Sequence, residues 1–113
     1  MNLQEIIQLL DLQLLTTPKD FNTIRPSGGY TSDLLSCVMA GAQPGNLWIT
    51  LQAHTNIVAV AALTDCAAII ITENAQPETD VIEKANSQGV SMFSTRLANY
   101  EVSGKLWNLL SMN

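Results

Sequence analysis

The amino-acid sequence predicts an α/β fold built around a mostly parallel sheet. Short apolar segments alternate with longer helical ones through the second half of the chain. The expected strands cover residues 46–51, 67–72 and 91–94, and the expected helices cover residues 54–63, 77–88 and 97–110. Such alternation favours right-handed crossovers between parallel strands. Residues 67–72 (AAIIIT) are apolar almost throughout, which is typical of a strand covered on both faces. We therefore expect a single three-layer domain spanning residues 1–113.

The first part of the chain predicts shorter elements. Residues 3–10 place their apolar side chains at helical spacing, so a short amphipathic helix is expected there. Residues 12–16 and 22–25 are expected to form two short strands, separated by a turn at residues 18–20.

Start and stop signals define two of the helices. A helix of about ten residues is expected between Thr31 and Gly41, because four apolar side chains share one face and glycine commonly follows a helix. The helix over residues 77–88 opens with Pro77 and two acidic residues, which suit a first helical turn, and Gly89 is its expected stop.

Two helices carry more apolar surface than one sheet contact covers. The helix over residues 54–63 is apolar nearly all round, so we expect it to be buried on more than one side. The helix over residues 97–110 has a wide apolar face that includes Tyr100 and Trp107. A second copy of the chain would cover the excess, and a homodimer is therefore expected.

The composition excludes several classes of partner. Charged residues make up 13% of the 113 residues, against about 25% in typical soluble domains. The net charge is −5 and the five cations are scattered singly, whereas nucleic-acid binding needs clustered Lys and Arg. The longest uncharged apolar run, residues 56–64, is far shorter than the ~20 residues of a membrane span. We expect a cytoplasmic protein without a nucleic-acid or membrane partner.

The two cysteines, Cys37 and Cys66, are expected to be free thiols buried among apolar residues, because Cys is one of the most buried residue types. They form no Cys-x-x-Cys pair. With one histidine in the chain, no recognised metal-ligand spacing is present, and no cofactor is expected.

Polar residues follow each of the three clear strands. They are Gln52, His54, Thr55 and Asn56 after the first, Thr72, Glu73 and Asn74 after the second, and Ser94, Thr95 and Arg96 after the third. Ligands of parallel α/β sheets bind outside the carboxyl ends of the strands, so we expect these segments to converge along one edge. Arg96 is the cation placed there to hold a phosphate or carboxylate. Thr55 is expected to cap a helix whose N–H groups face an anion. The alternative is that these residues only cap helices and close turns.

His54 has three candidate roles. As a general base it would need a nucleophile and an orienting acid, and Glu73 is the acid within reach of this edge. No serine or cysteine lies in a nucleophile-elbow pattern, so we expect no catalysis. The remaining roles are a hydrogen-bonded structural residue at a helix start and a contact to a ligand.

Residues 24–41 concentrate a proline, two adjacent glycines and several helix-capping residues. The sequence around Gly28 and Gly29 is similar to a phosphate-binding loop, but Asp33 places a negative charge where a phosphate would lie, and the Gly-x-x-x-x-Gly-Lys-Ser/Thr pattern is absent. We expect the glycines to adopt positive φ angles and to allow a close approach to the sheet or to a second copy. Tyr30 either stacks on a flat ligand or packs at a subunit interface.

These residues resemble the DRTGG domain family, which is named for a five-residue motif ahead of a helix. The resemblance extends over nearly the whole chain and rests on residues 27–36, 47–50, 52–61 and 68–72. In the motif itself Gly28 and Gly29 match, Ser27 replaces the threonine, and Arg25 and Pro26 replace the Asp-Arg pair.

The resemblance implies a fold similar to the N-terminal domain of HPr kinase/phosphorylase. It also implies a non-catalytic regulatory or assembly module, because family members occur beside CBS domains in regulated pyrophosphatases and in front of phosphotransacetylases. In some members an adenine-nucleotide site lies near a dimer interface. No kinase activity is implied, since the phosphate-binding loop of that kinase belongs to a separate domain.

The sequence therefore predicts a non-enzymatic, dimeric regulatory module that senses a small ligand, with an adenine nucleotide as the candidate and a regulated enzyme subunit as a further partner. The candidate ligand-binding residues are Gly28, Gly29, Tyr30, His54, Thr55, Asn56, Thr72 and Arg96. Arg96 would pair with a phosphate, and Tyr30 would line the flat part of the ligand or the dimer seam. The alternative is a protein–protein interaction subunit that binds no small molecule. A hydrolase or transferase based on His54 and Glu73 ranks third.

Overall fold

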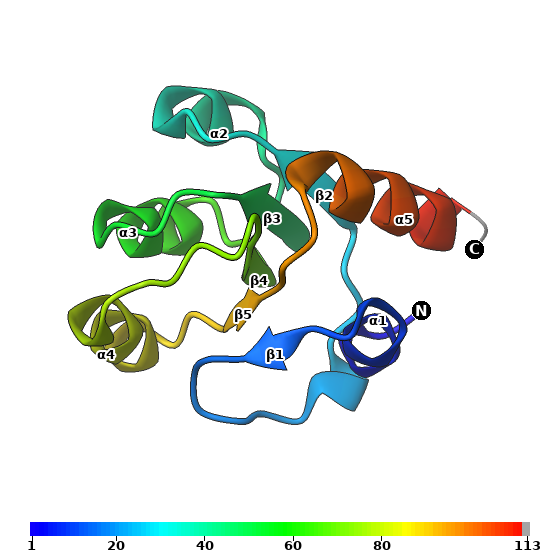
Figure 1. Ribbon diagram of the computed structural model, residues 1–113, viewed down its shortest axis with the longest axis horizontal. Helices are drawn as coiled ribbons and strands as arrows, with labels where there is room; N and C mark the ends of the chain where they lie inside the picture. Colours follow the sequence, from blue (N-terminus) through cyan, green and yellow to red (C-terminus); the bar gives the residue numbers. More distant parts are fainter. Residues whose placement is uncertain (112–113) are drawn as a thin grey trace.

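The computed structural model describes residues 1–111 and shows a five-stranded sheet with helices on both faces (Figure 1). The strands are β1 (Gln13–Leu14), β2 (Gly28–Thr31), β3 (Asn46–Thr50), β4 (Ala68–Ile71) and β5 (Met92–Ser94). Their order in the sheet is β1-β5-β4-β3-β2. The strands β2 to β5 are parallel, and β1 pairs antiparallel with β5. The predicted α/β class with a mostly parallel sheet is confirmed.

Within the described residues, five α-helices and one 3-10 helix surround this sheet. They are α1 (Leu3–Leu10), η1 (Phe21–Thr23), α2 (Leu35–Gly41), α3 (Asn56–Leu63), α4 (Thr79–Gln88) and α5 (Asn99–Ser111). Helices α2, α3 and α4 cover one face, and α1 and α5 cover the other, which gives the three expected layers (Figure 1). No helix within residues 1–111 is long and apolar enough to cross a lipid bilayer.

The helix ends follow from local hydrogen bonds and backbone conformation. The Oδ1 atom of Asn2 accepts a hydrogen bond from the N–H of Glu5, and the Glu5 carboxylate accepts one from the N–H of Asn2, so α1 begins with a capping box. Gly89 ends α4 at a φ of 71°, the left-handed conformation that glycine adopts without strain, as expected.

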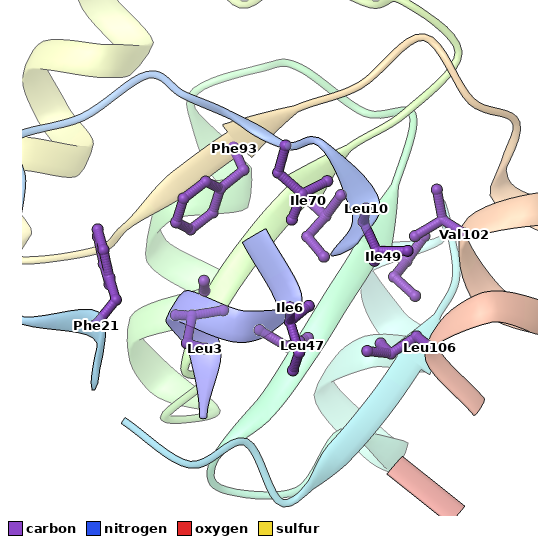
Figure 2. Packing of buried hydrophobic residues seen from close by; sticks show 12 residues of the cluster. Leu3, Ile6, Leu10, Phe21, Leu47, Ile49, Ile70, Phe93, Val102 and Leu106 are labelled. Atoms are coloured by element: carbon purple, nitrogen blue, oxygen red, sulfur yellow. The ribbon is translucent and has the colours of Figure 1, made fainter. Parts of the chain in front are cut away.

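The side chains of the central strands alternate between two buried clusters. Trp48 and Ile69 point toward α2, α3 and α4, whereas Leu47 and Ile70 point toward α1 and α5. Figure 2 shows this second cluster, in which side chains of α1 and α5 meet those of β3, β4 and β5. Burial on both faces explains why the central strands are apolar nearly throughout.

Two expected elements differ in the structure. Residues 22–25 do not form a strand, because the Asp20 carboxylate accepts a hydrogen bond from the N–H of Asn22 and the Thr23 hydroxyl donates to the Asp20 carbonyl, which favours the 3-10 turn of η1. The helix expected from Thr31 begins only at Leu35, because residues 28–31 form the edge strand β2.

Burial also differs from expectation at α2 and α3. Both thiols are free, as expected, but neither is fully buried. Cys37 is exposed, because Val38 is the one fully buried residue of the short helix α2. Cys66 is half-buried. Helix α3 packs on the sheet between α2 and α4, yet Leu63 stays 73% exposed. Helix α3 therefore has more apolar surface than this single chain buries.

Candidate functional site

The parallel strands bring the polar segments to one edge of the sheet. Thr50 at the end of β3 lies opposite Ile71 of β4, and Ile71 lies opposite Ser94 of β5. The chain therefore leaves all three strands at the same edge, which is called the carboxyl edge below.

Asp33 connects three elements at the carboxyl edge. Its Oδ1 atom accepts hydrogen bonds from the Thr50 hydroxyl at 2.9 Å and from the N–H of Leu51 at 2.8 Å. The side-chain amide of Asn99 donates to both carboxylate oxygens of Asp33, at 3.4 and 3.3 Å. The loop before α2 is thereby tied to the end of β3 and to the start of α5.

Asn99 links the same carboxylate to the end of β4. Its side-chain oxygen accepts a short hydrogen bond from the hydroxyl of Thr72, which is fully buried. The N–H of Asn99 donates to Oε2 of Glu73 at 2.9 Å, so this carboxylate lies at the positive end of the α5 dipole. Thr72 and Glu73 therefore hold the start of α5 in place.

Arg96 lines a depression of about 790 Å³ at the carboxyl edge, between α5 and the segment that joins α1 to β1. We call it the Arg96 depression. Its polar wall includes Lys105, Asn74 and Gln76, together with one carboxylate, Asp11, and its apolar wall includes Leu9, Leu12 and Leu97. Within residues 1–111, the side chains of Arg96 and Lys105 form no hydrogen bond and no ion pair. Two of the five cations of the chain are thus available at one hollow.

His54 and Thr55 line a smaller hollow of about 290 Å³. Gln76 lines both this hollow and the Arg96 depression, so the two adjoin. Glu78 and Asp80 make the smaller hollow acidic. Thr55 precedes α3, but its side chain makes no capping hydrogen bond among the described residues, which corrects the expected cap. Asn56, the first residue of α3, is exposed.

Gly28, Gly29 and Tyr30 belong to a third hollow, a groove of about 750 Å³ between β2 and α5. This β2–α5 groove is lined mainly by Gly28–Thr31 of β2 and by Tyr100, Ser103, Gly104 and Trp107 of α5. None of the described residues that line it is charged. Of the eight candidate residues, six therefore line three separate hollows, Thr72 forms a buried hydrogen bond, and Asn56 is exposed outside them.

Comparison with protein families identifies the class of this domain. A sequence model of the DRTGG domain matches residues 34–109, more than half of the chain.

The chain belongs to the DRTGG domain family.

The match extends from the residue before α2 into the last turns of α5. It begins after Ser27, Gly28 and Gly29, so membership rests on the downstream sequence.

A solved structure shares this fold. It contains the CBS and DRTGG domains of the regulatory region of Clostridium perfringens pyrophosphatase, complexed with the activator diadenosine tetraphosphate. The two chains are 17% identical with a TM-score of 0.71, and the match covers 92% of this DRTGG domain but 44% of that chain. The chain thus spans less than half the length of that structure. A comparison with curated proteins finds no match.

One glycine of the pair, Gly29, allows close packing in this DRTGG domain. Gly28 and Gly29 lie in a strand without positive φ angles, which corrects the expected left-handed conformation. A Cβ atom on Gly29 would lie 2.9 Å from Cδ2 of Leu106, so glycine lets α5 approach β2. Tyr30 packs its ring against Gly41 and donates a hydrogen bond to the Cys37 carbonyl at 3.1 Å.

Sequence reasoning missed Asn99, Lys105 and the bridging role of Asp33. Asn99 and Lys105 lie within a helix whose polar side could not be oriented from the sequence. The role of Asp33 could have been predicted, because this acidic residue follows β2 closely, and polar residues that follow parallel strands share the carboxyl edge.

Proposed function

We propose that this DRTGG domain is a non-catalytic, dimeric regulatory module that binds an adenine nucleotide at the Arg96 depression. The observation that carries the proposal is the presence of Arg96 and Lys105 at one hollow, without partners among residues 1–111, in a chain of net charge −5. Arginine binds phosphate oxygens in bidentate fashion, and lysine adds a point charge. The pyrophosphatase region of similar fold was solved with diadenosine tetraphosphate, which supports the class of ligand.

The walls of the depression suit the remaining parts of a nucleotide. Asn74 and Gln76 offer amide donors and acceptors, and Leu9 and Leu97 offer apolar surface for a base. Its volume lies within the range of about 300–1,000 Å³ that small-molecule sites occupy.

His54, Thr55 and Asn56 would act at the outer end of the ligand. His54 and Thr55 lie beyond Gln76, with Asn56 exposed beside them, and would hydrogen-bond the far end of a dinucleotide. The carboxylates of Glu78 and Asp80 would keep phosphate groups away from that end. Thr72 would act indirectly, by holding Asn99 and hence α5.

The positions of His54 and Glu73 support a non-catalytic role. Glu73 accepts a hydrogen bond from the N–H of Asn99, whereas His54 lines the smaller hollow, so the two do not form a base oriented by an acid. A regulatory module of this kind would act on a partner enzyme subunit.

Thermal unfolding with AMP, ADP, ATP and diadenosine tetraphosphate tests the proposal. A ligand at about 100 times its Kd adds about 2.7 kcal/mol of stability, which raises the Tm of a domain of this size by several degrees. We expect Arg96→Ala and Lys105→Ala to abolish that shift while the unliganded Tm stays within about a degree, because both side chains lack internal partners. Lys84→Ala removes an exposed cation of α4 and should retain the shift. The absence of any shift with the wild type, or a normal shift with Arg96→Ala, would contradict the proposal.

The second candidate is an assembly subunit that binds no small molecule. The exposed aromatic side chains of the β2–α5 groove favour it. A protein that assembles normally but shows no nucleotide-dependent shift would support this candidate over the first.

A further inference from the structure

Tyr100 and Trp107 project from α5 beside the β2–α5 groove. Their side chains are 88% and 76% exposed, whereas Trp48, the other tryptophan, is fully buried. They are seven residues apart, which is two helical turns, and therefore lie on the same side of α5. The opposite side of the helix packs into the core through Val102 and Leu106. Helix α5 thus has two apolar sides, and the rest of residues 1–111 covers only one.

The same face combines these projecting rings with a hollow. Gly28 and Gly29 of β2 and Gly104 of α5 border the groove, and a Cβ atom on Gly104 would meet nothing within 4 Å. A contact between two identical subunits related by a two-fold axis requires one surface that is complementary to itself. A surface with both large rings and a glycine-lined hollow meets this requirement.

The charge distribution favours a second copy as the occupant. The chain has five basic and ten acidic residues, yet none of the described residues that line the groove is charged. Near a two-fold axis each residue lies close to its own counterpart, so charged residues there would face like charges. An uncharged face is one on which two chains of net charge −5 can meet without that repulsion. It also offers no cation to a nucleotide phosphate.

The edge of β2 provides the second part of the contact. Strand β2 pairs with β3, and within residues 1–111 no strand pairs with its outer side. Exposed edge strands are usually protected by charged residues or proline within the strand. The four residues Gly28–Thr31 contain neither.

We infer that the β2–α5 groove is the contact face between two copies of this chain, with Trp107 of each copy seated in the groove of the other. The two β2 strands lie antiparallel across the axis, and the two α5 helices lie side by side on the same side of the joined sheets. The inference rests on the dimeric part of the proposed function and specifies which face forms the dimer.

Gly104 provides the test, because it lies between Tyr100 and Trp107 and has room for a side chain. Sedimentation velocity should show a dimer for the wild type and for Gly104→Ala. We expect Gly104→Glu to weaken dimerisation by at least about tenfold, since it would bury two unpaired carboxylates at the axis. A mixture of Gly104→Glu with Gly104→Lys should recover a dimer through opposite charges. Compared with the wild type at a concentration at which all the proteins are monomeric, the unfolding midpoint should not fall in either variant, because both replace glycine within a helix.

A wild type that stays monomeric at about 100 μM would overturn the inference, because a dimer with a Kd well below this concentration would be populated there. The face would then be left to a different protein. A Gly104→Glu protein that dimerises as the wild type does would overturn it as well.

Tryptophan fluorescence gives an independent measurement. Trp107 is the exposed tryptophan, so iodide should quench it in the Gly104→Glu protein and much less in the wild-type dimer. Equal quenching of the two proteins would contradict the inferred position of Trp107.

Nucleotide affinity separates this inference from the proposed ligand site: Gly104→Glu should bind nucleotide, and Arg96→Ala should dimerise. If Arg96→Ala loses nucleotide binding but still dimerises, the inferred interface does not depend on the ligand site. If Gly104→Glu loses dimerisation but still binds nucleotide, the proposed ligand site does not depend on the interface.

Discussion

The side-chain amide of Asn99 lies 3.3 Å from Oδ2 of Asp33, although the two residues are 66 positions apart in the chain. Asp33 also binds the end of β3, and Asn99 also binds the end of β4. This pair therefore sets where α5 begins relative to the sheet. Because α5 forms a wall of both the Arg96 depression and the β2–α5 groove, the pair also positions the two proposed contact surfaces.

Replacing Asp33 tests this role. We expect Asp33→Ala to lower the free energy of unfolding by about 3 kcal/mol, because two partly buried donors, on Thr50 and Asn99, and the more exposed N–H of Leu51 lose a charged acceptor. Asp33→Asn retains one acceptor oxygen and should cost about 1 kcal/mol. Urea denaturation followed by the fluorescence of Trp48, whose indole N–H donates to the carbonyl of neighbouring Ser32, measures both changes. Equal losses in the two variants would show that the carboxylate is not the important acceptor.

The two adjacent glycines should respond differently to alanine. At Gly28 the added Cβ atom lies 3.5 Å from the nearest atom, an ordinary contact, so Gly28→Ala should be nearly neutral. At Gly29 the same atom lies 2.9 Å from the buried Leu106 side chain, and Gly29→Ala should destabilise the protein by about 1 kcal/mol through overpacking. Differential scanning calorimetry of the two variants makes the comparison. The opposite ranking would refute the packing argument.

Ser91 carries a hydroxyl without a hydrogen-bond partner among the described residues, although its side chain is 2% exposed. Ser91→Ala removes this unsatisfied group and should raise the free energy of unfolding by up to about 1 kcal/mol. Thr16→Val is the matched contrast, because the Thr16 hydroxyl accepts a hydrogen bond from the N–H of Met92 at 3.0 Å. That variant should lose about 1–2 kcal/mol in the same guanidinium titration. A destabilised Ser91→Ala protein would indicate a partner that the single chain does not provide.

Alkaline pH should destabilise the protein through Cys66. Burial raises the pKa of the Cys66 thiol above its ordinary value of 9.0, and the hydrogen bond with Thr64 opposes that rise. Because the folded pKa exceeds the unfolded one, the contribution of this thiol is complete below about pH 9 and is lost as the pH rises through the folded pKa. We expect Cys66→Ala to lose less stability than the wild type between about pH 8 and pH 10. Parallel pH profiles for the two proteins would exclude this thiol as the cause.

The sequence predicted the regular elements where periodicity and stop signals agreed. The first helix has the predicted bounds, and Gly89 ends α4 as expected. The prediction failed at residues 22–25 and 28–31, where short polar segments carry little periodicity. There the outcome depended on hydrogen bonds made by Asp20 and on pairing with β3, neither of which a local pattern contains.

The candidate site was predicted in part for a similar reason. Arg96 and Asn74 follow β5 and β4, and the structure places both at the Arg96 depression. Lys105 reaches the same depression from α5, and no spacing in the sequence relates it to Arg96. Tyr30, which was expected to face a ligand or a second subunit, lines the β2–α5 groove and also packs its ring against Gly41 of its own chain.

The sequence by itself determined the alternation of strands and helices from residue 46 onward, the parallel sheet and hence the single edge at which the polar connectors emerge, because these follow from periodicity, handedness and chain direction. Only the tertiary structure decided that the connectors divide among separate hollows and that α5 stands between an uncharged groove and a basic depression. That division depends on the rotation of each helix about its own axis, which is fixed by contacts such as Gly29 with Leu106 and Asp33 with Asn99 between residues distant in the chain.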